Sequence, residues 1–143
     1  MTSTEISRLL DDICRDNDYV FAFQTTQEVR DLVVEIKRLV ALTNIVDKEW
    51  QSTDLEPLLG CLTAFIGDLD ISISREKTLI YENKKQILGG TENSESEDDG
   101  SGSETKYNDI YVSYYEDIKC GAVRSRDRVV EWQLIMIKKI NFV

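Results

Sequence analysis

Hydrophobic residues recur at intervals of three and four along most of the chain, which is the spacing of amphipathic helices. The clearest run covers about 26–48, where a single apolar stripe alternates with charged positions. A shorter run predicts a helix over about 3–16, and a longer run predicts one over about 54–88. We therefore expect residues 1–88 to form a helical domain.

Each of these runs is preceded by a capping-box sequence, in which a threonine and an acidic residue three positions later satisfy each other's free backbone amides. The pairs are Thr2 with Glu5, Thr25 with Glu28, and Thr53 with Glu56. These signals predict where the three helices begin.

The last part of the third run has two interpretations. The letters "LDISIS" alternate as in a strand, whereas Ile66, Ile73, Ile80 and Ile87 lie seven residues apart, as along a coiled-coil seam. We favour a helix, because no turn residue interrupts the segment before Gly89. Such a helix is about 50 Å long at 1.5 Å per residue. It would form an antiparallel hairpin with the preceding helix.

Residues 89–106 are rich in Gly, Ser and Glu and contain six acids and one base. This composition cannot bury enough apolar surface to offset chain entropy, so we expect a disordered acidic linker. Ser94, Ser96 and Ser101 each have an acid three residues downstream, which is the pattern of an acid-directed kinase. They are candidate phosphorylation sites, and a plain solubilising linker is the alternative.

Residues 107–143 form a C-terminal segment whose pattern fits either a helix or strands. Its apolar residues follow helical spacing, but "IYVSYY" and "VVEWQLIMI" also suit strands, and Gly121 is expected to interrupt the pattern. The segment would complete the bundle or bind a partner. The predicted fold is all-α: an elongated helical hairpin or bundle with a disordered acidic insert and a C-terminal segment that packs back.

Composition narrows the class of protein. A net charge of −10 and a pI near 4.5 disfavour direct binding to nucleic acid, which depends on cationic side chains. The longest near-apolar run, "LLGCLTAFIG", is about half a membrane span, so no span is expected. The three cysteines lie far apart and are odd in number, which favours reduced thiols. We expect an intracellular protein of the nucleus or cytoplasm.

The chain offers little catalytic chemistry. It has no histidine, the commonest general base and metal ligand, and no nucleophile motif, phosphate loop or EF-hand. Two charged clusters are interpreted as solvated helix surfaces: Asp11, Asp12, Asp16 and Asp18, and Arg124, Arg126 and Arg128. We therefore expect no enzyme, no catalytic residue, no cofactor and no metal.

Large apolar and aromatic residues are numerous for a small bundle, and such residues anchor many protein interfaces. The candidate partner-binding residues are Trp50, Ile73, Ile80, Ile87, Tyr111, Tyr115 and Trp132. The predicted function is a non-enzymatic subunit of a larger intracellular complex, with a hetero-oligomer favoured over a homo-oligomer. The alternative is a self-contained helical regulator, such as viruses use, that captures a partner's amphipathic helix in a groove.

Overall fold

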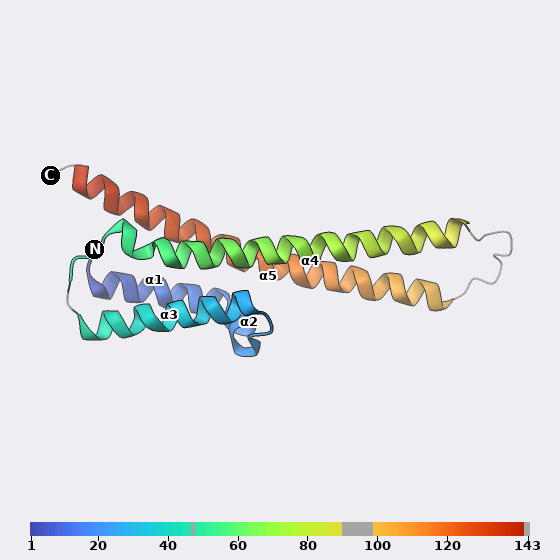
Figure 1. Cartoon of the computed structure of the whole chain (residues 1–143), viewed down its shortest axis with the longest axis horizontal. Coiled ribbons are helices and arrows are strands. Elements are labelled where there is room, and N and C mark those ends of the chain that lie inside the picture. Colours follow the sequence, from blue (N-terminus) through green and yellow to red (C-terminus); the bar gives the residue numbers. More distant parts are fainter. Residues whose placement is uncertain (47, 90–98, 142–143) are drawn as a thin grey trace. The chain divides into compact units, whose positions relative to one another are not determined.

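The computed structural model describes the backbone of residues 1–46, 48–89 and 99–141, and the side chains of these except 83–108 and 139–141. All regular structure in the described residues is helical, which confirms the predicted all-α fold. The elements are α1 (Ser3–Asp16), α2 (Asp18–Phe23), α3 (Gln27–Ile45), the short 3-10 helix η1 (Ser52–Leu55), α4 (Glu56–Gly89) and α5 (Asp99–Asn141) (Figure 1).

The helix starts follow the capping signals unevenly. Thr2 and Glu5 form the predicted capping box at α1. At α3 the cap is Thr26, one residue later than predicted, and its hydroxyl accepts from the Val29 amide. The third prediction is wrong: the Gln51 backbone amide donates to the Asp54 carboxylate at the start of η1, so the chain enters α4 through a tighter turn.

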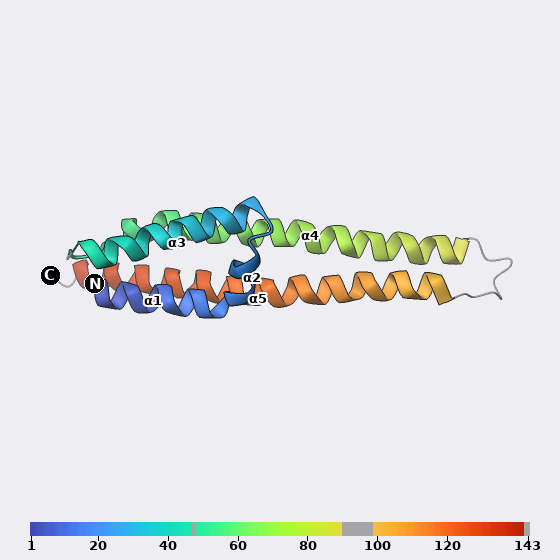
Figure 2. The ribbon, with the colours of Figure 1, turned by 90° about the horizontal axis from the view of Figure 1, so that it is seen from below.

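The chain divides into two compact units. The first, which we call the bundle unit, comprises Met1–Asp68 and Cys120–Val143. Within it, α1 and α3 run alongside the first part of α4 and the last part of α5 (Figures 1 and 2). Each of these helices contributes fully buried aliphatic residues, among them Ile6, Leu32, Leu62 and Val129. Burying one such side chain contributes about 1.5–3 kcal/mol, so this shared core holds the unit together.

The second unit, which we call the hairpin unit, spans Leu69–Lys119. In it the second part of α4 and the first part of α5 lie side by side and antiparallel (Figures 1 and 2). Leu69 and Ile73 of α4 are buried.

The hairpin differs from the predicted one, which paired α4 with the helix before it. The helix α3 has 19 residues and α4 has 34, so α3 cannot accompany α4 along its whole length. Helix α3 ends because the backbone becomes extended at Val46. The apolar seam of the second part of α4 is covered by α5 instead.

Helix α5 settles the open question about the C-terminal segment. It runs without interruption through Gly121, so the expected break there is wrong. A Cβ at Gly121 would lie 2.9 Å from the backbone oxygen of Asp16, so this glycine permits a close approach between α1 and α5 rather than ending a helix.

The described helices also enter both ends of the segment predicted as linker. Gly89 belongs to α4, and α5 begins at Asp99. Residues 90–98 lie outside the described residues, and disorder there stays a prediction.

Candidate docking surfaces

The seven candidate partner-binding residues occupy different environments. Trp50 and Ile73 are buried, at 1% and 8% exposure, and so belong to the interior. Ile80, Tyr115 and Trp132 are half-buried, and Tyr111 is 50% exposed. The side chains of Ile87, Ser94, Ser96 and Ser101 lie outside the described residues. Tyr111 is therefore the one of these candidates that the described structure presents openly.

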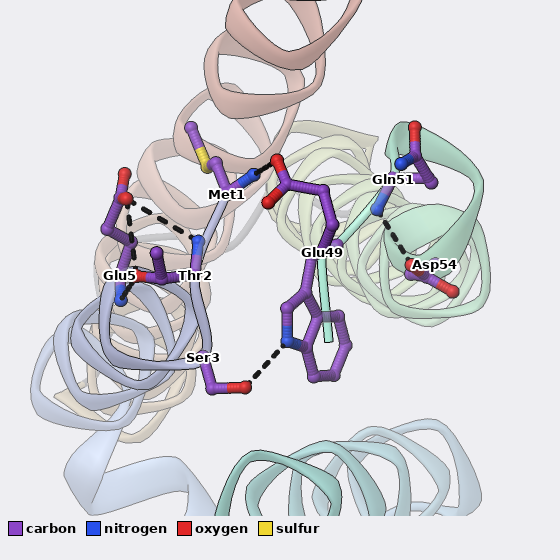
Figure 3. A network of polar contacts seen from close by, with 8 residues as sticks. Met1, Thr2, Ser3, Glu5, Glu49, Gln51 and Asp54 are labelled. Carbon is purple, nitrogen blue, oxygen red and sulfur yellow. Dashed lines mark hydrogen bonds and ion pairs between the residues drawn. The ribbon is translucent and has the colours of Figure 1, made fainter. Parts of the chain in front are cut away.

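Trp50 joins the start of α1 to the connection between α3 and α4. Its indole N–H donates to the Ser3 hydroxyl at 3.0 Å, and its backbone N–H donates to the Met1 carbonyl at 2.9 Å (Figure 3). The Ser3 hydroxyl in turn donates to the Val46 carbonyl, and the Lys48 ammonium lies 4.6 Å from the indole centre. These contacts satisfy both N–H groups of the buried tryptophan.

Asp54 lies in η1, within the connection between α3 and α4, and is held as a carboxylate. Burial alone raises its pKa, but hydrogen bonds from the Gln51 amide and the Lys48 ammonium, with the charges of Lys48 and Arg38, outweigh burial and bring the pKa below 3.8. Because the pKa is lower in the folded state, this carboxylate stabilises the fold above its unfolded pKa, and the effect is lost as the pH falls through the folded pKa.

An Asp54→Asn variant is therefore expected to have a free energy of unfolding about 0.5–1 kcal/mol lower at neutral pH. The difference from the parent protein should close only as the pH falls through the folded pKa of Asp54, which lies below 3.8, because the parent carboxylate is then also protonated. Urea unfolding at neutral pH and at a pH below the folded pKa of Asp54 measures this difference in the free energy of unfolding. The control is Asp11→Asn, at an exposed position of α1. A difference that is independent of pH would contradict it.

The acidic end of α1 is tied to α5 by Arg128, so Asp12, Asp16 and Arg128 are not simply solvated charges. Asp11, Asp18 and Arg124 are exposed, as the interpretation of solvated helix surfaces predicts. Arg128 Nη1 lies 3.4 Å from a carboxylate oxygen of Asp12 and equally far from the buried Oδ2 of Asp16. Beside them the buried Asn17 amide donates to Ser125 Oγ at 2.8 Å, and Ser125 donates to the Gly121 carbonyl. These contacts fix the register of α1 on α5.

Side chains that can bind a metal ion are dispersed over the described part of the chain, and two of the three thiols are half-buried. No group of three or more His, Cys, Asp or Glu side chains suited to a metal ion occurs among the described residues. Burial raises the pKa of the Cys14 thiol, and Asp11 and Asp18 raise it further. Burial likewise raises the pKa of Cys61, with help from Glu35 and Asp31. Both thiols are therefore kept in their unreactive protonated form.

The hairpin unit has two unlike edges. On one edge, which we call the ion-pair edge, the Lys77 ammonium lies 3.5 Å from a Glu116 carboxylate oxygen, and the Lys119 ammonium lies 2.6 Å from Asp70. These contacts show that the Asp70 and Lys77 side of α4 and the Glu116 and Lys119 side of α5 face the same way.

On α5, Tyr111, Tyr114 and Ile118 lie roughly 140° around the helix from Glu116 and Lys119, at 3.6 residues per turn. On α4, Leu79 lies roughly 170° from Asp70 and Lys77 by the same count. These residues therefore gather on the opposite edge, together with Ile110. We call this the tyrosine edge, and it consists of Leu79, Ile110, Tyr111, Tyr114 and Ile118.

The tyrosine edge is open to solvent. Ile110, Tyr111, Tyr114 and Leu79 are 60%, 50%, 42% and 40% exposed, and Ile118 is half-buried. Tyr114 and Ile118 were not among the candidate partner-binding residues, although they share the helical spacing of Tyr111 in the C-terminal segment.

Helix length also bears on membranes. The segment Ser52–Glu82, which runs from η1 into α4, is long and apolar enough to cross a bilayer by length and composition alone, because it contains an 18-residue window with a mean hydropathy of 1.3. A third of this apolar window is buried inside the structure, and core helices of soluble proteins pass the same test. The absence of a membrane span therefore stays a prediction.

Comparison with known proteins gives no relative: no family model, no curated protein and no solved structure matches the chain.

Proposed function

We propose that the chain is a non-enzymatic binding subunit of a larger protein assembly, and that its tyrosine edge docks an amphipathic helix of another protein. The observation that carries this proposal is the asymmetry of the hairpin unit. Its ion-pair edge carries two charged contacts and one exposed tyrosine, Tyr81, whereas the opposite edge presents a cluster of aliphatic and tyrosine side chains.

A two-helix hairpin can bury only the seam between its helices, because neither helix has a third neighbour in the described part of this unit. Tyrosine favours interfaces, since it buries a large area with few rotatable bonds and keeps a polar tip. A third helix laid along the tyrosine edge would cover these side chains and turn the pair into a three-helix arrangement.

Charge favours a different protein over a second copy as the occupant. Residues 69–119 carry 12 acids and 6 bases, and the net charge of −6 comes entirely from the acidic stretch 92–104, so the acidic stretches of two copies would repel each other. A partner that carries Lys and Arg beside its docking helix complements this stretch. This supports a hetero-oligomer.

The experiment places a photoreactive benzophenone side chain at Tyr111 and, as a matched control, at Tyr81. Tyr81 is more exposed, at 66%, but it lies one turn from Lys77 on the ion-pair edge. We expect crosslinks in cells of the source organism from Tyr111 and not from Tyr81. Mass spectrometry would identify the partner and the crosslinked segment.

With the identified partner purified, Tyr111→Ala and Tyr114→Ala are each expected to weaken binding by about tenfold, or 1.4 kcal/mol. Tyr81→Ala should leave the affinity unchanged. Equal crosslinking from both edges, crosslinking mainly to a second copy of the chain, or affinities insensitive to Tyr111 and Tyr114 would each contradict the proposal.

A further inference from the structure

The helix α2 is apolar and yet has no buried residue. It has the sequence DYVFAF and connects α1 to α3 (Figure 1). Tyr19 and Phe23 are 59% and 62% exposed, and their rings lie 4.9 Å apart. Fully burying a Phe side chain is worth about 1.5–3 kcal/mol, so this exposure forgoes a large share of the available stabilisation. An exposed aromatic pair of this kind is a candidate contact surface.

Helix α2 also lines a pocket, through Phe21 and Ala22 rather than through the Tyr19 and Phe23 pair. The pocket has a volume of about 310 Å³ and lies between α1, α2 and α3. Its apolar walls include Cys14, Phe21, Val33 and Ile36, and it also contacts Asp18 and Lys37. Pockets for small molecules range from about 300 to 1,000 Å³, so this one is at the lower limit. It has room for one or two large side chains rather than for a cofactor.

The backbone around the pocket is held in a costly conformation. Gln24, which follows α2 and lines the pocket, has φ 45° and ψ 51°, the left-handed region that favours glycine. Arg30 holds this turn by donating to the Gln24 carbonyl at 3.2 Å. At the other end, Asn17 is fixed to α5 through Ser125. The short helix is thus clamped at both ends, which keeps the pocket in one shape before anything binds.

The charges around the pocket distinguish a protein from a membrane as the occupant. Residues 11–24 carry four acids and one base, whereas binding to anionic lipid requires a basic cluster. At the pocket itself, Asp18 and Lys37 have opposite signs, which would orient a segment that carries the complementary charges.

We propose that the α2 corner, formed by α2 and this pocket, is a second docking site for a short segment of another protein. The segment inserts one or two large apolar side chains between α2 and α3, and it brings a basic residue to Asp18 and an acidic residue to Lys37. This site lies in the bundle unit and is separate from the tyrosine edge, so it stands whether or not the proposed function of that edge fails.

The test begins with a displayed library of random peptides selected on the full chain, from which the enriched peptides are synthesised. We expect them to combine a large apolar residue with one basic and one acidic residue. Phe23→Ser is expected to weaken binding about tenfold, and Ala22→Arg, which fills the mouth of the pocket, should do the same. Ile45→Ser, at an apolar site of α3 that is 77% exposed, is the control and should change nothing.

A charge exchange separates this site from general stickiness. Lys37→Glu should weaken binding of the selected peptide. Replacing the acidic residue of that peptide by Lys should restore its binding to the Lys37→Glu variant. Circular dichroism confirms that each variant remains folded. The proposal is overturned if no selected peptide depends on Phe23, if the charge exchange gives no rescue, or if Phe23 is required instead for binding to phosphatidylcholine vesicles that contain phosphatidylserine.

Discussion

A Trp50→Ala variant is expected to lose about 3–5 kcal/mol of unfolding free energy, the range for truncating a buried aromatic residue. The side chain is 1% exposed, so nearly its whole volume would become a cavity between α1 and the connection that leads into η1. The lost indole would also leave Ser3 without its donor and Lys48 without the ring beneath it. A small domain is stable by only about 5–15 kcal/mol, so this variant should be close to unfolding.

Two further substitutions calibrate this effect. Trp50→Phe keeps an aromatic ring and loses the hydrogen bond to Ser3, so its loss should be intermediate. Trp132→Ala removes a tryptophan that is only half-buried, so its loss should be smaller than that of Trp50→Ala. Guanidinium unfolding followed by circular dichroism measures all three. If Trp50→Ala lowered the free energy of unfolding by less than about 1 kcal/mol, the start of α1 and the connection into η1 would not be packed around this ring.

Periodic segments were predictable because a helix with one buried face repeats its apolar residues at a fixed spacing. The bounds of α1 were predicted to the residue, and those of α3 and α4 to within a few residues. The first capping box was predicted correctly because both partners are local. The short helix α2 was not predicted as a separate element, because its start at Asp18 follows from the anchoring of Asn17 to α5, far along the chain.

Partner choice between helices could not be predicted from periodicity. An apolar stripe indicates that a helix has a covered face but not which helix covers it, so pairing the second part of α4 with α5 was missed. The ion pair of Arg128 with Asp12 and Asp16 was missed for the same reason, since each residue alone resembles a solvated charge. Trp50 was named as a surface anchor because a lone tryptophan between two helices fits an interface and a core equally well.

The surface was partly predictable. Tyr111 was named in advance and is exposed on the tyrosine edge. The edge itself emerged only when the ion pairs of Lys77 and Lys119 showed which sides of α4 and α5 face the same way. A helical repeat assigns residues to faces of a single helix, whereas a docking surface on two helices also requires their relative rotation.

A Gly121→Ala variant is expected to be destabilised, although alanine is the better helix former by about 1 kcal/mol. The added methyl group would lie 2.9 Å from the Asp16 carbonyl oxygen and 3.4 Å from the Asn17 side-chain oxygen. Because the nearer atom belongs to the backbone, relief requires α1 to move on α5. That movement would disturb the bonds of Asn17 to Ser125 and of Arg128 to Asp16. Overpacking of this kind costs about 1–3 kcal/mol, which exceeds the gain in helix propensity.

The chain supplies its own controls for this prediction. Gly60 and Gly67 also lie within a helix, but nothing is within 4 Å of a Cβ added to either one. Gly60→Ala and Gly67→Ala should therefore each raise the unfolding free energy by up to about 1 kcal/mol. The same chemical change is expected to have opposite signs at Gly121 and at these two positions, with a difference of roughly 2 kcal/mol in urea unfolding. If all three alanines were stabilising, α1 and α5 would not approach as closely as the structure has them, and Gly121 would be an ordinary exposed position of a long helix.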